Sequence, residues 1–191
     1  MTLKETLKAT ASVRNAGQLP APKGIGMAVA FDWGLTVELF LIPLFMVFLE
    51  ASIMPKQASI ASNFTLIFVF VFSWAIAALF AIFGEGVRRG WRWTRPIQIV
   101  GNALGFIGGL ALLVQLFNNI KVGNYWSLVP TFILLIISPI IVWRLSRPET
   151  ATWFKSVTSQ QARQRHSGSW VWWIALWSII GGTLVALGAF H

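Results

Sequence analysis

The stretch FTLIFVFVFSWAIAALFAIF, residues 64–83, contains 20 residues and no charged side chain. At about 1.5 Å of rise per residue, a helix of this length spans the roughly 30 Å of hydrocarbon in a bilayer. Its apolar residues are continuous and do not alternate with polar ones, which indicates a helix and not a strand of a membrane barrel. This stretch therefore predicts an α-helix that crosses a membrane.

Four further stretches have a similar apolar character. They are residues 28–49, 97–117, 127–143 and 170–190. The composition agrees, because 56% of the residues are hydrophobic and 11% are charged, whereas soluble domains have about 45–50% and about 25%. The predicted fold class is all-α: a polytopic integral membrane protein with a bundle of five transmembrane helices, residues 28–190, preceded by an N-terminal segment, residues 1–27.

The number of lysine and arginine residues alternates along the segments between these spans. It is 4 in the N-terminal segment, then 1, 4, 1 and 5 in the four loops, and 0 after the fifth span. Basic residues gather on the cytoplasmic side of a membrane. The pattern predicts an N-terminus inside and a C-terminus outside, and it is typical of a bacterial inner membrane.

The predicted topology also accounts for the net charge of +9. It places most of this charge on one face, where the anionic lipids of the cytoplasmic leaflet attract it. Lipids are therefore the partners that the charge predicts, and a nucleic-acid partner is not expected.

Large aromatic side chains cluster at the predicted cytoplasmic ends of the spans. Tryptophan rings are amphipathic and commonly lie at the level of the lipid headgroups. We interpret these residues as interfacial anchors, with an aromatic pocket for a flat ligand as the alternative. The predicted anchors are Trp91, Trp93, Trp143, Trp153, Phe154, Trp170, Trp172 and Trp173.

The fourth loop is the longest segment between two spans. Its sequence Ser146-Arg147-Pro148-Glu149 has the spacing of a capping box, which predicts the start of a helix. Apolar residues after it fall on one side, and Lys155 and Gln161 fall on the other. This pattern predicts an amphipathic helix that lies on the cytoplasmic leaflet between the fourth and fifth spans, either as a linker or as a docking helix for a partner.

Two carboxyl groups lie within the first span. Asp32 is near its cytoplasmic end and Glu38 is near its middle, and Pro43 lacks the N–H that would bond to the carbonyl four residues before it. Ionisable groups at membrane depth often mark ion or proton sites, so Asp32 and Glu38 are candidates for one. The alternative is a structural hydrogen bond to a neighbouring span, for which Gln98 and Asn102 share one helix face.

Small residues repeat at four-residue spacing in the third and fifth spans. Such ridges let two helix backbones approach closely. They predict either packing within the bundle or contact with another subunit or a cofactor. The two ridges are Gly101, Gly105 and Gly109, and Ser178, Gly182 and Ala186.

Several kinds of site lack the residues that they need. The sequence contains no cysteine, and its only histidines, His166 and His191, lie outside the central parts of the spans. A haem held by two membrane-embedded histidines is therefore excluded, and no metal site is expected. No Ser-His-Asp arrangement has a suitably placed base. A bound lipid, quinone or carotenoid needs only apolar walls and is compatible with the sequence.

Three functional hypotheses remain. The leading one is a non-catalytic integral membrane subunit or scaffold of a larger assembly, partnered by other membrane subunits or by copies of itself. The first alternative is a small oligomeric transporter or channel that uses Glu38. The second alternative is an enzyme that acts on a lipid or a quinone, although the sequence favours a protein without catalytic activity.

Overall fold

The computed structural model describes residues 22–53 and 60–188, and the side chains of residues 22–48 and 64–188. Residues 1–21 of the predicted N-terminal segment lie outside this part. Every regular element in the described ranges is a helix. The helices are α2 (Ile25–Ile53), α3 (Ile60–Arg88), α4 (Thr94–Lys121), α5 (Leu128–Phe132), η1 (Ile133–Ile137), α6 (Ser138–Ser146), α7 (Pro148–Ser156), α8 (Ser159–Arg165) and α9 (Ser169–Gly188).

Five helical rods are long and apolar enough to cross a membrane, which confirms the predicted fold class. Four of them are α2, α3, α4 and α9, and the fifth is the continuous run α5–η1–α6. The helices extend a few residues beyond the predicted apolar runs, because a helix can continue past the hydrocarbon into the headgroup region. The chain thus fits a multi-pass membrane protein.

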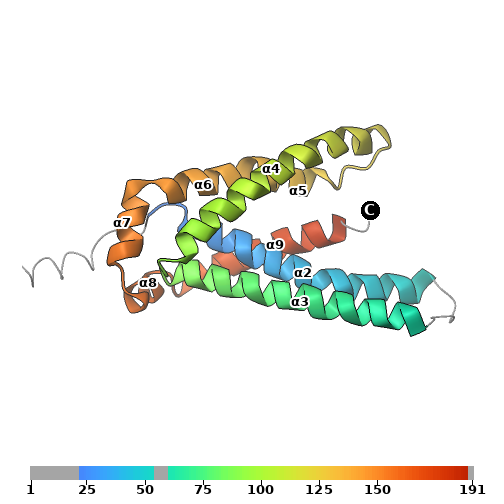
Figure 1. The fold of residues 1–191 in the computed structure, drawn as a ribbon, viewed down its shortest axis with the longest axis horizontal. Helices are drawn as coiled ribbons and strands as arrows, with labels where there is room; N and C mark the ends of the chain where they lie inside the picture. The colour runs from blue at the N-terminus through green and yellow to red at the C-terminus, as the bar shows by residue number, and fades with distance from the viewer. Residues whose placement is uncertain (1–21, 54–59, 189–191) are drawn as a thin grey trace, which may run out of the picture.

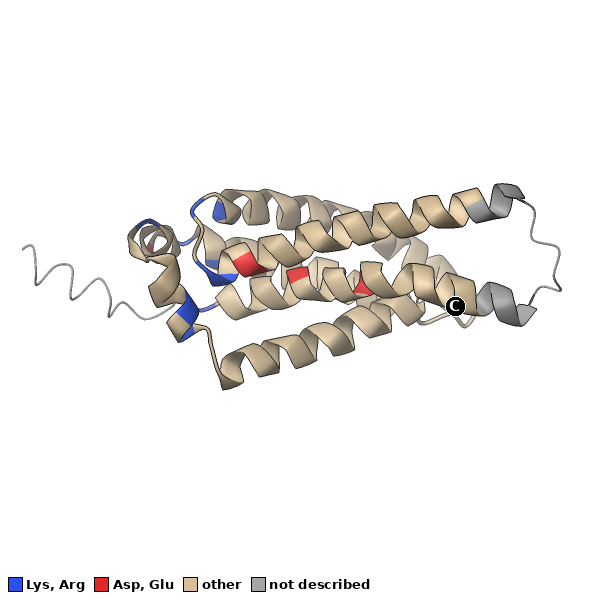
Figure 2. Cartoon of the chain, turned by 90° about the horizontal axis from the view of Figure 1, so that it is seen from below, with Lys and Arg blue, Asp and Glu red and all other residues tan. Residues whose placement is uncertain are grey.

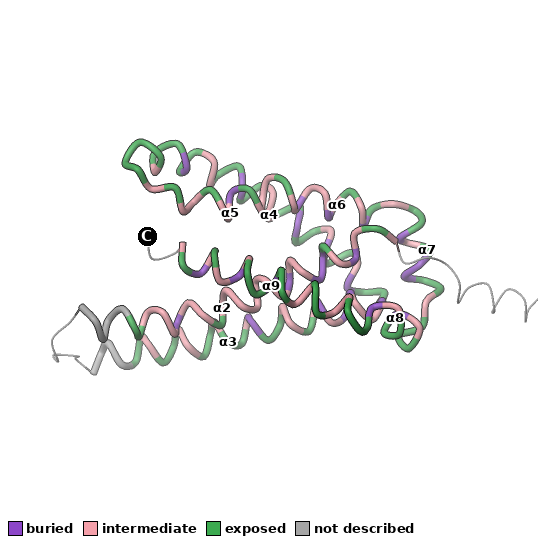
Figure 3. The backbone as a smooth tube through the Cα atoms, turned by 180° about the vertical axis from the view of Figure 1, so that it is seen from behind, coloured by how far each residue is buried: buried purple, intermediate pink, exposed green. Residues whose placement is uncertain are grey.

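The five rods form two groups (Figure 1). In the three-helix group, α2 packs along both α3 and α9. In the hairpin group, α4 packs against α5, η1 and α6. Figure 3 shows the hairpin group separating from α2 and α3 with distance from α7. The two groups therefore share few direct contacts, and those contacts hold the bundle together.

Positive charge gathers at the end of the bundle that carries α7 and α8, which we call the basic end (Figure 2). The opposite end is called the far end. Among the described lysine and arginine residues, only Lys121 lies at the far end. The basic end carries Lys23, Arg88, Arg89, Arg92, Arg95, Arg144, Arg147, Lys155, Arg163 and Arg165.

A buried cluster at the basic end joins the two groups. It unites α2, α3 and α6 with the short helices α7 and α8, and these helices cover its outer side. Arg95 on α4 donates a hydrogen bond of 2.8 Å from Nε to the carbonyl oxygen of Leu145. The cluster consists of Ile25, Ala28, Val29, Val87, Ile141, Leu145, Trp153, Phe154 and Ala162.

The segment between α6 and α9 differs from the single interfacial helix that the sequence predicts. The chain forms two short helices, α7 and α8, with an extended residue, Val157, at the end of α7. Arg147, not Ser146, is the N-cap of α7, and its side chain makes no capping bond. The capping box is formed instead by Thr158 and Gln161 at the start of α8. The predicted capping box is wrong because Arg147, just before Pro148, is extended, so the helix of Ser146 ends there.

Two predicted anchors also lie elsewhere. Trp153 and Phe154 are buried inside the basic-end cluster, with exposed fractions of 3% and 2%. Their rings meet edge to face with centroids 5.0 Å apart. They are buried because α7 folds back under the helix ends, so its apolar side meets protein instead of lipid.

Small residues permit the close approach of α2 and α9. A Cβ atom at Gly182 would collide with the carbonyl oxygen of Gly34 and lie 2.8 Å from Cβ of Val37. The Ser178 hydroxyl donates hydrogen bonds to the carbonyl oxygens of Ile174, at 2.7 Å, and of Ala30, at 3.2 Å. The structure thus places Gly182 and Ser178 of the second ridge inside the bundle, and Ala186 is also buried.

The first ridge is divided between two surfaces. Gly109 lies against Leu134, where an added Cβ would be 2.8 Å from the Cβ atom of that leucine, and Gly105 lies beside Leu134 and Ser138. Gly101 has no other group within 4 Å of its Cβ position. Two members of this ridge therefore pack inside the hairpin group, and the third lies on its outer surface.

A pair of adjacent glycines on α9 tests the packing of α2 against α9. Gly182→Ala should destabilise the protein by about 1–3 kcal/mol, because the new methyl group meets backbone that cannot easily move. Gly181→Ala is the matched control, since no group lies within 4 Å of the Cβ position there. Thermal unfolding in detergent measures both changes. Equal unfolding temperatures for the two variants would contradict this packing.

Candidate functional site

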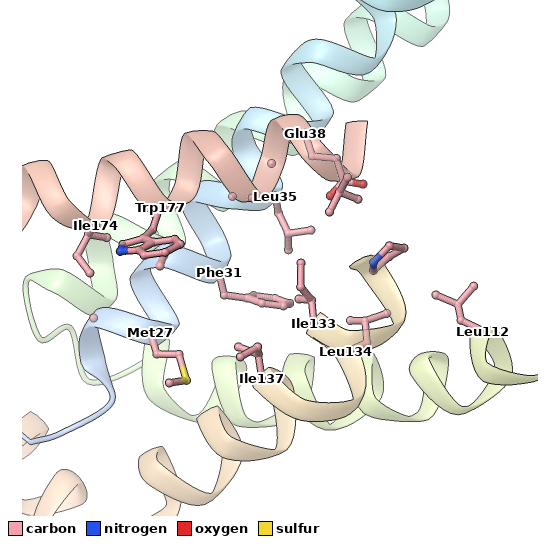
Figure 4. A pocket seen from close by; sticks show the side chains of 17 residues that line it. Met27, Phe31, Leu35, Glu38, Leu112, Ile133, Leu134, Ile137, Ile174 and Trp177 are labelled. Atoms are coloured by element: carbon pink, nitrogen blue, oxygen red, sulfur yellow. The ribbon is translucent and has the colours of Figure 1, made fainter. Parts of the chain in front are cut away.

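A pocket of about 630 Å³ lies between the three-helix group and the hairpin group. We call it the lateral pocket (Figure 4). One wall comes from α2 and α9, and the opposite wall comes from α4, α5 and η1. The α2 wall consists of Gly26, Met27, Ala30, Phe31, Gly34, Leu35 and Glu38. The α9 wall consists of Ile174, Trp177, Gly181, Gly182 and Val185.

The wall formed by α4, α5 and η1 contains a π-helical turn. Ile133, Leu134 and Ile137 of η1 line the pocket. The N–H of Ser138 donates to the carbonyl oxygen of Ile133, five residues earlier. Pro139 follows directly and has no N–H to continue the α-helical pattern. The π-turn is the relaxed arrangement of a helix before this proline, and such turns often occur at functional sites.

The lateral pocket is bounded at both ends and open at its side. At the far end, Trp126 lies against Gly188. A Cβ atom added to this glycine would be 3.5 Å from the tryptophan. At the other end, the basic-end cluster fills the space between the groups. Trp177 and Met27 line the pocket although 64% and 36% of their surfaces are exposed. A molecule would therefore enter from the side, out of the surrounding hydrocarbon.

Glu38 is the only charged residue among those that line the pocket. Its side chain is half-buried, and no hydrogen bond or ion pair joins it to another described residue. Figure 4 shows Glu38 toward one end of the pocket and Trp177 toward the other, with Phe31 and Leu35 between them. The site thus combines long apolar walls with one carboxyl group. Helix α2 continues through Pro43, and Pro43 is buried.

Asp32 lies in a different place, on the side of α2 that faces α3 and α4. It is 2% exposed, and its carboxylate accepts a short hydrogen bond from Nε2 of Gln98. Oε1 of Gln98 in turn accepts a bond of 2.7 Å from Nδ2 of Asn102. This chain, the Asp32–Gln98–Asn102 bridge, ties the three-helix group to the hairpin group. The structure therefore joins Gln98 and Asn102 to Asp32 and does not bring them to Glu38.

Two buried oxygens near this bridge have no hydrogen-bond partner among the described residues: Oδ1 of Asn102 and Oγ of Ser138. Both residues belong to the contact of α4 with α6, because Gly105, three residues beyond Asn102, lies beside Ser138. Buried polar groups of this kind commonly bond to an ordered water. The two oxygens thus extend the polar region around the bridge into the contact of α4 with α6.

Asp32 offers a direct test of the bridge. Asp32→Asn keeps an oxygen that can accept from Gln98 and should change stability by less than about 1 kcal/mol. Asp32→Leu has a similar size but leaves the buried Gln98 amide unpaired, and should cost about 1–3 kcal/mol. Thermal unfolding in detergent compares the two. If Asp32→Leu were as stable as Asp32→Asn, the bridge would have no role in joining the groups.

A second polar contact closes the basic end. Nη1 of Arg88 donates to the carbonyl oxygen of His166 at 2.9 Å, and Nδ1–H of His166 donates to the carbonyl oxygen of Arg88 at 3.1 Å. Glu85 holds the guanidinium of Arg88 through two bonds of 2.6 Å. The imidazole lies between Trp153 and Trp170, with ring centroids 5.8 and 4.6 Å away. Burial lowers the pKa of His166 below its usual value, although the bond to Arg88 acts in the opposite direction.

The lowered pKa of His166 predicts how stability depends on pH. Above the ordinary pKa of 6.5, the imidazole is neutral in both the folded and the unfolded chain. His166 then makes its full contribution to the free energy of unfolding. As the pH falls through that value, the unfolded chain binds the proton first. Folding then loses up to about 1.4 kcal/mol per pH unit until the folded pKa is reached.

The measurement is thermal unfolding in detergent between pH 7.5 and about 5. His166→Asn keeps a donor for the Arg88 carbonyl and does not titrate at this position. As the pH falls through this range, we expect the midpoint of the wild-type chain to drop relative to that of His166→Asn. Parallel curves for the two proteins would show that His166 does not carry the effect.

The remaining predicted anchors occupy the outer surface of the basic end. Trp93, Trp143, Trp172 and Trp173 are exposed, and Trp91 and Trp170 are half-buried. Trp143 also receives the guanidinium groups of Arg144 and Arg147, at 4.8 and 4.1 Å from its ring centroid. Within the described residues, no group of three or more histidine, cysteine, aspartate or glutamate residues could hold a metal ion.

The lateral pocket was not predicted from the sequence. Its walls come from three separate parts of the chain, α2, the α4–α5–η1 hairpin and α9, and apolar residues in a membrane span give no sign of which side they face. The proline in the sequence IISPII, residues 136–141, was the one signal of an irregular turn.

Comparison of the chain with protein-family models, with curated proteins and with solved structures gave no match.

Proposed function

We propose that the protein is a non-catalytic integral membrane subunit or scaffold, and that its lateral pocket holds an apolar molecule taken from the membrane. The observation that carries this proposal is the pocket itself, which lies between two helix groups and opens at the side. Its lining is apolar except for Glu38. A site of this composition is suited to binding, because a single carboxyl group without a described partner provides little catalytic machinery.

The size of the pocket supports a small apolar occupant. Its volume of about 630 Å³ falls within the roughly 300–1,000 Å³ of ordinary small-molecule sites. Along α2 it runs from Gly26 to Glu38, which is about 18 Å at the rise of a helix. A pocket of this volume and length suits a lipid-like molecule in one leaflet.

A partner subunit has a separate surface available on α4. Gly101 and Gly108 lie seven residues apart on one helix face, are exposed, and have no other group within 4 Å of their Cβ positions. Small residues on a membrane helix let a second helix approach closely. These two glycines support the part of the proposal that concerns another membrane subunit or a second copy of this chain.

We also propose that the basic end faces the cytoplasm of a bacterial cell and that the protein lies in the inner membrane. The support is the concentration of arginine and lysine at that end, since basic residues favour the cytoplasmic side. There, α7, α8 and the exposed tryptophans would rest at the level of the anionic headgroups.

A small oligomeric transporter or channel is the second candidate. Glu38 favours it, because this carboxyl group lines the pocket and lies at membrane depth without a described partner. Intramembrane carboxyl groups commonly mark the paths of ions and substrates. In this case the pocket would be a stage in transport and not a permanent binding site.

Purification of the tagged chain from its native membrane in a gentle detergent, followed by native mass spectrometry, tests the leading proposal. We expect foreign subunits in fixed ratio and a bound apolar molecule. Gly181→Leu places a large side chain in the pocket, at a position where an added Cβ atom has no group within 4 Å, and should lose the small molecule but keep the subunits. Gly108→Leu changes the outer face of α4 and should show the opposite pattern.

A lone homo-oligomer with an empty pocket would contradict the proposal. Transport by Glu38 would then become the leading candidate. A flux across liposome membranes that Glu38→Gln left unchanged would contradict that candidate in turn.

A further inference from the structure

We infer that the lateral pocket binds a lipophilic organic cation, with Glu38 as its counter-ion. The inference rests on the part of the proposed function that makes the pocket a ligand site, and it adds the charge of the ligand. Three observations carry it: the single carboxyl group in the pocket, the absence of a described partner for that group, and the aromatic rings that line the same pocket.

No described residue near Glu38 could balance the negative charge of its carboxylate in the ionised form. None of the other residues that line the pocket is charged. The described lysine and arginine residues are at the basic end, except for Lys121, which is exposed at the far end. An ionised carboxylate among apolar walls is costly unless a positive charge accompanies it. A cationic ligand supplies that charge from outside the chain.

Aromatic side chains of the pocket favour the same class of ligand. Phe31 and Trp177 line it on the same side as Glu38 (Figure 4). The face of an aromatic ring attracts a cation within about 6 Å, and the attraction grows when water is excluded. A cation that passes along the pocket toward Glu38 therefore meets attractive groups on one wall.

The route into the pocket sets the second property of the ligand. Because Trp126 and Gly188 bound the far end and the buried cluster bounds the basic end, entry is from the side. A molecule that arrives through hydrocarbon must be largely apolar, with its positive charge shielded or delocalised. An anionic amphiphile would be repelled by an ionised Glu38, and a neutral one would not balance the charge of that carboxylate.

Tetraphenylphosphonium and tetraphenylborate test the inference, because they have nearly the same size and shape but opposite charge. Binding of each to the purified full-length protein in a maltoside detergent is measured by isothermal titration. Pocket binding is defined as the part of the measured binding that Gly181→Leu removes. This definition separates binding in the pocket from partition of the ion into the micelle. Ala78→Leu, on the exposed side of α3, is the matched control for an added side chain.

The wild-type chain should bind the phosphonium in the pocket and should not bind the borate there. Glu38→Gln should weaken phosphonium binding at least about tenfold, since removing one member of a buried charge pair commonly costs more than this. Glu149→Gln makes the same charge change at an exposed position of α7 and should leave binding unchanged, as should Ala78→Leu.

Pocket binding of the borate as strong as that of the phosphonium would overturn the inference, and so would phosphonium binding that Glu38→Gln leaves intact. Absence of any pocket binding of the phosphonium would also overturn it. The two ions are compared on the same pair of proteins, wild type and Gly181→Leu, so that only the sign of the ligand charge differs. The phosphonium could fail to bind in the pocket while Gly181→Leu still loses a native apolar molecule that the wild-type chain retains. The proposed function would then stand, and only the inferred positive charge of the ligand would be wrong.

Discussion

The contact between α2 and α9 is the interaction on which the rest of the bundle depends. Within a membrane, apolar side chains gain little by leaving lipid for another helix, so close backbone packing has to supply much of the attraction. Gly182 and Gly34 bring the two backbones close together. Their contact places Glu38, Trp177 and Phe31 on one continuous wall, and it fixes the position of the lateral pocket relative to α2.

The two ends of the molecule are built on different principles. At the basic end, a buried cluster, the Asp32–Gln98–Asn102 bridge and the paired bonds of Arg88 and His166 join the two helix groups and the short helices that cover them. Toward the far end, the hairpin group turns away from α2 and α3 (Figure 1), and an apolar pocket lies between it and α2.

The sequence was sufficient to predict the helical spans, because a continuous apolar run of membrane length is rare outside a transmembrane helix. It was also sufficient to predict that Asp32 and Glu38 lie within the first of these spans. It could not assign their partners, because Gln98 is 66 residues away from Asp32 and either carboxyl group could have been its neighbour. The burial of Trp153 and Phe154 was equally hidden, since an amphipathic segment can turn its apolar side toward lipid or toward its own protein. Likewise, four-residue spacing showed that Gly101 and Gly109 could pack closely, but not that they lie on different surfaces.

For a protein that binds a ligand in this pocket, as proposed, the side opening makes the lipid phase the reservoir from which that ligand is drawn. The concentration that sets occupancy is then the one in the leaflet, and a very dilute compound in water can be abundant there if it partitions strongly. Modest contacts inside the pocket would suffice for high occupancy. Selection between two ligands would depend first on how each dissolves in the membrane, and only then on what Glu38 and the surrounding rings prefer.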